Sequence, residues 1–173
     1  STSNLCFTNP TQSCITVEVL PLPTATISGS GVLCAGAGGS VDLTVTLTGD
    51  PEWTFVYAIG GVPQPSITTS TSPYIITATQ PGNYTLVSVR SIDADPDCIG
   101  TVSGNVAINL VTLTPTSTTV AAVCGENNGS VNLSISGGIA PYMYIWSNGE
   151  TTQDLSNVPP GTYSTTITDN NGC

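Results

Sequence analysis

Two stretches of the chain repeat one residue pattern, and this repeat constrains the fold more than any other feature. CAGAGGSVDL from residue 34 and CGENNGSVNL from residue 124 share the spacing C-x4-G-S-V-[DN]-L. Further matches follow in the same order: EWTFVY with PYMYIW, QPGNYT with PPGTYS, and Cys98 with Cys173. Unrelated turns would not keep this order, so we interpret the chain as two copies of one structural unit.

The repeat divides the chain into three segments. Cys6 followed by ITVEVL matches Cys98 followed by VAINLV, so residues 1–20 resemble the end of a preceding copy. Proline-bearing stretches at 20–24 and 112–118 are expected to be short linkers that connect neighbouring modules almost rigidly. The predicted segments are the C-terminal strand region of a preceding module at 1–20, a full module at 21–113 and a shorter module at 114–173.

Apolar and polar residues alternate along the predicted strands. Val41 and Leu43 share one face while Asp42 lies on the other, which is the period of a β-strand. Asn148-Gly149 is expected to form a type I′ hairpin turn. The predicted fold class is therefore all-β, with tandem immunoglobulin-like antiparallel β-sandwich modules. The further predicted strands are 24–28, 53–59, 74–78, 84–92 and 105–111 in the first copy, and 130–136, 142–146, 151–155 and 163–168 in the second.

The charge of the chain excludes several classes of partner. Charged residues make up 7% of the chain. The chain has eleven acidic residues and one basic residue, Arg90, which gives a net charge of -10. Such a surface repels nucleic acid and anionic lipid. No apolar run is long enough to span a bilayer, so we expect no membrane insertion in this segment. Any export signal or anchor is expected outside these residues.

The chain contains no His and no Lys. The usual general base, the commonest metal ligand, the Schiff-base amine and every Ser-His-Asp arrangement are therefore absent. We predict that the protein is not an enzyme and has no catalytic cofactor. Without Lys, the chain cannot form Lys-to-Asn isopeptide bonds, so cystine is the covalent cross-link that remains.

Six cysteines without a CxxC pair indicate a disulfide framework made in an oxidising compartment, so we expect an extracellular protein. Because two cysteines flank each copy, the expected bonds are Cys34–Cys98 and Cys124–Cys173. Each bond would contribute roughly 4 kcal/mol by restricting the unfolded chain. Cys6 and Cys14 are expected to pair with each other, and the alternative is a partner for Cys6 upstream of the chain.

Aromatic side chains share one face of the equivalent strand in both copies. Tyr142, Tyr144 and Trp146 have one parity, as do Trp53 and Phe55 in the first copy. We interpret these rings as the cores of thin sandwiches, because large rings fill a small core efficiently. The alternative is a platform on which sugars stack.

Four further side chains are assigned roles by their position on these strands. Met143 and Ile145 have the opposite parity and would point outward, so they form a candidate contact patch for a neighbouring module or another chain. Tyr84 and Tyr163 follow Pro-Gly by two residues at the entry to a strand. Immunoglobulin-type sandwiches place a tyrosine there whose hydroxyl bonds back to the chain upstream.

Three acids form the one candidate metal site. Asp93, Asp95 and Asp97 stand at alternate positions in DADPDC. This spacing can line a calcium site if other oxygens complete the six to eight ligands that calcium takes. The alternative is a solvated acidic loop.

The C-terminal segment resembles a known repeat. Residues 137–173 contain a P-Y-x-Y-x-W strand, an S-N-G turn, T-T-Q-D-L, P-G-T-Y and a terminal D-N-N-G-C. In these elements the segment resembles the SprB-type repeat of very large surface adhesins used in gliding motility by bacteria of the Bacteroidota. That family usually has polar residues where Met143 and Ile145 stand, so this copy departs from it there. The first copy, with PLPTATISGSG and PGNYTLVSV, is similar to immunoglobulin-like modules found in tandem in the same kind of secreted protein.

The resemblance implies export by the type IX secretion system, display on the cell surface or in a surface filament, and a mechanical role. We therefore expect a structural stalk or filament segment whose partners are neighbouring modules of the same polypeptide and other copies in a filament. One alternative is a carbohydrate-binding or calcium-dependent adhesive module with a surface or glycan ligand. The other is the non-catalytic stalk of a secreted hydrolase.

Overall fold

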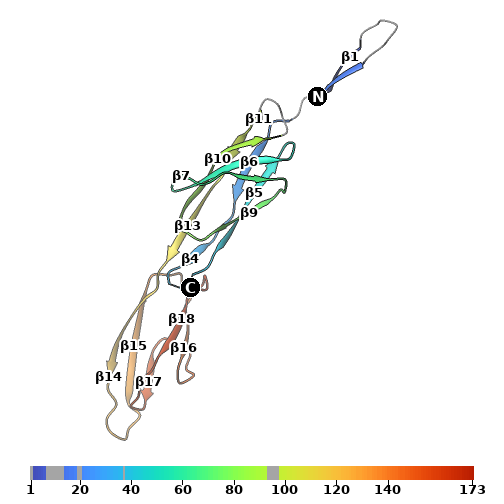
Figure 1. The fold of residues 1–173 in the computed structure, drawn as a ribbon. Helices are drawn as coiled ribbons and strands as arrows, with labels where there is room; N and C mark the ends of the chain where they lie inside the picture. Colours follow the sequence, from blue (N-terminus) through green and yellow to red (C-terminus); the bar gives the residue numbers. More distant parts are fainter. Residues whose placement is uncertain (1, 7–13, 19–20, 37, 93–97) are drawn as a thin grey trace. The chain divides into compact units, whose positions relative to one another are not determined.

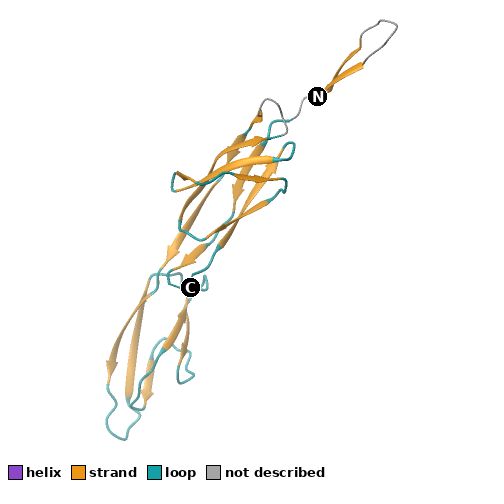
Figure 2. Ribbon diagram, viewed as in Figure 1, coloured by secondary structure: helices purple, strands orange, loops and turns teal. Residues whose placement is uncertain are grey.

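The computed structural model describes residues 2–6, 14–18, 21–36, 38–92 and 98–173. Every regular element in this part of the chain is a strand and none is a helix (Figure 2). The predicted all-β fold class is therefore confirmed. The chain divides into two compact units: unit 1 comprises Ser1–Gly31 and Val41–Ile108, and unit 2 comprises Val32–Ser40 and Asn109–Cys173.

Apart from an N-terminal hairpin, the described part of unit 1 is built from two β-sheets (Figure 1). The first has the order β12-β3-β5-β9, with β3 (Thr24–Ser28), β5 (Val41–Thr48), β9 (Tyr74–Ala78) and β12 (Thr101–Ser103). The second has the order β4-β13-β10-β6-β7, with β8 on β6 and β11 on β10, and β4 (Val32–Cys34) and the last three residues of β13 group with unit 2. Its strands are β6 (Trp53–Ile59), β7 (Val62–Pro63), β8 (Ile67–Thr69), β10 (Gly82–Ser91), β11 (Cys98–Ile99) and β13 (Asn105–Val111).

Apolar residues of both sheets form the core of unit 1. Leu43 and Val45 of β5 have no exposed surface, whereas Asp42, which directly precedes Leu43, is exposed, as the alternation predicts. Phe55 of the second sheet is also fully buried. Its ring packs edge-on against that of Tyr74 in the first sheet, with centroids 5.5 Å apart. The two sheets therefore pack as a sandwich whose interior is filled by rings and branched side chains.

In each unit, the tyrosine that follows Pro-Gly is held by a hydrogen bond to the chain upstream. Tyr84 Oη donates to the carbonyl oxygen of Gln80 at 2.8 Å, and Tyr163 Oη donates to the carbonyl oxygen of Pro159 at 2.8 Å. The predicted bond back to the chain is therefore confirmed in both copies. Burial raises the pKa of Tyr84. The hydroxyl thus stays protonated and able to donate.

Unit 2 is a smaller sandwich. One sheet has the order β14-β15-β17, with β14 (Thr114–Val120), β15 (Gly129–Ser136) and β17 (Leu155–Val158). The other pairs β16 (Met143–Trp146) with β18 (Thr165–Thr168). Leu133, Trp146, Leu155 and Val158 form its buried cluster. The segment Val32–Ser40 groups with this unit, and β4 (Val32–Cys34) pairs in parallel with the last three residues of β13.

Two secondary-structure predictions for the second copy are wrong. Most of 112–118, expected to be a linker, lies in β14, which pairs with β15 over its whole length. Pro115 is tolerated because β14 is an edge strand, where a missing N–H need not break a ladder bond. The segment 151–155 is irregular until Leu155, where β17 begins.

The turn after β16 also differs from the prediction. Gly149 has a positive φ of 89°, but Asn148 does not, so the turn is not type I′. Gly149 N–H donates to the carbonyl oxygen of Trp146 at 2.9 Å, and Trp146 N–H donates to that of Glu150 at 2.9 Å. This is the pattern of a three-residue loop with glycine in the left-handed position. The strand that pairs with β16 is β18, which comes later in the chain.

A separate hairpin precedes the first sandwich. Its strands, β1 (Thr2–Cys6) and β2 (Cys14–Glu18), are antiparallel, and their register places Cys6 directly opposite Cys14. The predicted Cys6–Cys14 bond stays a prediction.

Replacing Tyr84 by Phe removes one hydrogen bond and keeps the buried ring. We expect Tyr84→Phe to lower the free energy of unfolding by about 1 kcal/mol, the usual net contribution of such a bond. Tyr57→Phe is the matched control: Tyr57 stacks on Tyr84 with centroids 6.3 Å apart, and the described residues show no hydrogen bond of its hydroxyl. Urea denaturation compares the variants, and wild-type stability of Tyr84→Phe would contradict this role.

Candidate functional site

Trp146 is a packing anchor of unit 2. Strand β16 turns its indole inward, where it is 5% exposed, and Nε1 donates to the carbonyl oxygen of Thr152 at 2.8 Å. Trp53 repeats the arrangement in unit 1, with 5% exposure and an Nε1 bond to the carbonyl oxygen of Thr48 at 3.1 Å. The core interpretation is therefore confirmed for both indoles, and neither offers a free face to a sugar ring.

The outer face of β16 is apolar and exposed. Met143 and Ile145 are 63% and 64% exposed, so the predicted outward orientation is confirmed. Their cross-strand neighbours on β18 are Thr168 and Thr166. A role of Met143 and Ile145 in contact with another module or chain stays a prediction.

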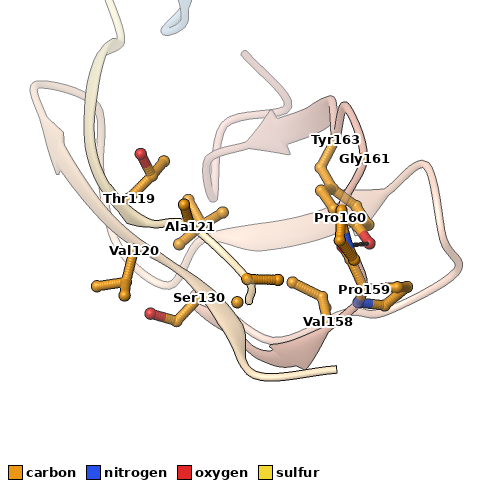
Figure 3. Close-up of a pocket in the computed structure, with 12 residues that line it drawn as sticks. Thr119, Val120, Ala121, Ser130, Val158, Pro159, Pro160, Gly161 and Tyr163 are labelled. Carbon is orange, nitrogen blue, oxygen red and sulfur yellow. Dashed lines mark hydrogen bonds between the residues drawn. The ribbon is translucent and has the colours of Figure 1, made fainter. Parts of the chain in front are cut away.

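An open groove lies beside the core of unit 2 (Figure 3). Thr119 of β14 lines one side, and Val158, Pro159 and Tyr163 line the other. The hydrogen bond from Tyr163 to Pro159 holds the ring in place. A second hollow shares Thr119 and Tyr163 and reaches Trp146. Hydroxyl and apolar groups line both hollows and charged groups line neither, so the groove is suited to an uncharged polar ligand.

The disulfide framework differs from the predicted one. Cys34 forms a disulfide with Cys173, and their Cα atoms lie 5.2 Å apart, within the usual range. Cys98 and Cys124 are free. The predicted bonds Cys34–Cys98 and Cys124–Cys173 are therefore wrong, and each sequence copy contributes one cysteine to the bond that forms.

Strand register explains why Cys34 does not meet Cys98. Cys98 pairs with Ser91 at the end of β10 in unit 1. Cys34 instead pairs with Val111, the last residue of β13, and belongs to unit 2. The sequence repeat preserves the order of the cysteines but does not say at which end of a sheet each one lies.

The β14–β15 hairpin separates the other two cysteines. Cys124 is exposed in the turn that joins the two strands. Cys173 lies toward the other end of the hairpin, because Asp169 binds both Cys173 and Ile139, which follows β15. A bond between Cys124 and Cys173 would have to span the length of β15.

A buried carboxylate positions Cys173. Asp169 is 1% exposed. Its Oδ1 accepts the N–H of Asn171 at 2.8 Å and that of Cys173 at 2.9 Å, and its Oδ2 accepts the N–H of Ile139 at 3.0 Å. Burial by itself would raise the pKa of Asp169, but these backbone donors outweigh it and lower the pKa. The carboxylate therefore fixes the turn that presents Cys173 to Cys34.

Sequence reasoning missed Asp169. The signal was present, because an Asp at the start of D-N-N-G often bonds the backbone two residues later. The bond from Asn171 N–H to Asp169 has this spacing. The contact with Ile139 joins segments thirty residues apart and has no local signature.

The predicted calcium ligands, Asp93, Asp95 and Asp97, lie in a segment outside the described residues. A calcium site there therefore stays a prediction. Within the described ranges, no group of three or more His, Cys, Asp or Glu is arranged to hold a metal ion. In those ranges there is also no helix with the length and hydropathy needed to cross a membrane.

Comparisons with known proteins support the repeat and the sandwich. Residues 116–151 match the family model of the SprB repeat, and residues 23–106 match that of the Ig-like domain of nucleoporin POM152. Each match covers less than half of the chain and lies within one of the two predicted modules. The chain thus carries an immunoglobulin-like module and a repeat similar to SprB, as the sequence resemblance indicated.

Fibronectin(III)-like modules of Clostridium thermocellum CbhA are 18% identical, with 86% of this chain and 87% of that chain covered and a TM-score of 0.37. None of the curated proteins searched matches the chain.

Removing the charge of Asp169 should loosen the last turn. Because its folded pKa is lowered, its contribution to stability is complete above about pH 4 and is lost as the pH falls through the folded value. We expect Asp169→Asn to lower the thermal midpoint at pH 7 and to reduce the loss of stability in acid. Asp42→Asn is the control, since Asp42 is exposed and accepts a bond from Thr77. Wild-type midpoints for Asp169→Asn at every pH would contradict this account.

Proposed function

We propose that the chain is a structural segment of a large extracellular cell-surface protein, in which it extends or displays adhesive regions. The match of residues 116–151 to the SprB repeat supports this proposal. In that setting the protein is exported by the type IX secretion system and serves attachment or gliding motility. Its partners are neighbouring modules of the same polypeptide and other copies in a filament.

One observation carries the proposal: both units bury their tryptophans in the core and hold a tyrosine by a hydrogen bond to the backbone. Each indole is buried and its N–H bonds a backbone carbonyl. Tyr84 and Tyr163 bond the chain four residues upstream. Groups that could recognise a ligand thus stabilise the sandwiches instead. The absence of His and Lys further supports a role without catalysis and without a cofactor.

A second candidate function is favoured by the groove of unit 2. Thr119, Ser130 and the ring of Tyr163 line it, and a sugar would find hydroxyl partners beside an aromatic face. A carbohydrate-binding module, or a calcium-dependent one that uses Asp93, Asp95 and Asp97, is therefore the alternative. The stalk of a secreted hydrolase would share the structural role and differ only in its neighbouring domains.

A binding screen separates the two candidates. A purely structural segment should give no signal on a glycan array and no heat in a calorimetric calcium titration of the disulfide-intact protein. A saturable glycan signal that disappears in Thr119→Ala, a substitution of an exposed groove residue, would contradict the structural proposal and place the ligand in the groove. Calcium binding that is lost in Asp95→Asn would also contradict the structural proposal, and it would place the calcium at the acidic segment.

A further inference from the structure

The Cys34–Cys173 bond creates a short covalent path through the chain. The bonded residues are 139 positions apart in the sequence. A path from Ser1 to Cys173 can therefore leave the backbone at Cys34 and cross the disulfide directly. Every residue from 35 to 172 then lies in a closed loop beside that path.

Backbone contacts anchor both ends of the bridge. At Cys34, the next residue, Ala35, donates its N–H to the carbonyl oxygen of Val111 at 2.8 Å. At Cys173, the N–H donates to the Asp169 carboxylate at 2.9 Å, and the carbonyl oxygen accepts the Asp169 N–H at 2.9 Å. The bonded cysteines are thus held by strand and turn structure, not by a loose tail.

After the hairpin of β1 and β2, which tension can open, the described part of the short path contains the strands β3 and β4. In unit 1 it passes through β3, which lies between β5 and β12 in its sheet and pairs with both. In unit 2 it passes through β4, which pairs with β13. A β-strand already rises about 3.2–3.4 Å per residue, close to the limit of about 3.3–3.6 Å for a fully extended chain. Tension therefore cannot lengthen these two strands appreciably.

We propose that the Cys34–Cys173 cystine is a mechanical bypass that carries tension past residues 35–172 and keeps most of both sandwiches unloaded. The inference deepens the structural role proposed above and rests on it. While the bond is intact, a force between the chain ends acts on residues 1–34, whose extended length is roughly 110–120 Å. Reduction puts the loop under tension and makes roughly 460–500 Å more chain extensible.

Single-molecule stretching tests the bypass. Handles are ligated to peptide tags at both termini, so that the free thiols of Cys98 and Cys124 are not used. We expect the oxidised protein to extend by no more than the short path allows. The reduced protein and Cys34→Ser should release several hundred ångströms more. Cys124→Ser is the matched control, because it removes an exposed free thiol, and it should behave like wild type.

An insertion tests the path with the bond kept intact, in case Cys34→Ser does not fold. About twenty Gly and Ser residues placed between Gly60 and Gly61, in an exposed turn, should add no length to the oxidised protein and full length to the reduced one. If oxidised wild type extends as far as reduced wild type, or if the insert lengthens the oxidised protein, the bypass is wrong. The glycan and calcium measurements do not depend on this bond, so either proposal can fail without the other.

Discussion

The covalent bond between Cys34 and Cys173 is the constraint on which the organisation of this chain depends. It closes a loop spanning 139 positions, which in the chain-entropy account stabilises the folded state by about 5 kcal/mol. That is comparable to the whole stability of many domains. The bond also ties the segment Val32–Ser40 to the C-terminal residue within unit 2. The chain is thus not two independently closed modules, although its sequence repeats.

Noncovalent stabilisation comes from packing and from neutral hydrogen bonds. With one basic residue in the chain, ion pairs can contribute little. The buried rings of Phe55 and Trp146 fill thin sandwiches, and hydroxyls and indole N–H groups bond backbone carbonyls around them. Carboxylates also contribute as acceptors: Asp154 accepts the N–H of Leu133, and the buried Asp169 is held by backbone donors and positions the cystine.

Much of the fold could be predicted from the sequence, because alternation and aromatic parity are local. The strands Thr24–Ser28, Trp53–Ile59 and Tyr74–Ala78 have the predicted bounds. Predictions from local signals were wrong where strand pairing is decisive. Pro115 suggested a linker, but the segment forms β14 because it pairs with β15. The cysteine pairing failed for the same reason. The parallel pairing of β4 with β13 takes Cys34 away from Cys98, and no spacing in the sequence reports that register.

Disulfide mapping of the non-reduced protein tests the central claim most directly. Free thiols are alkylated first, and the protein is then digested with pepsin in acid, where thiol–disulfide exchange is slow because thiolates are scarce. The account predicts one peptide that contains Cys34 linked to one that ends in Cys173, with Cys98 and Cys124 alkylated. Peptides that link Cys34 to Cys98 and Cys124 to Cys173 would contradict it.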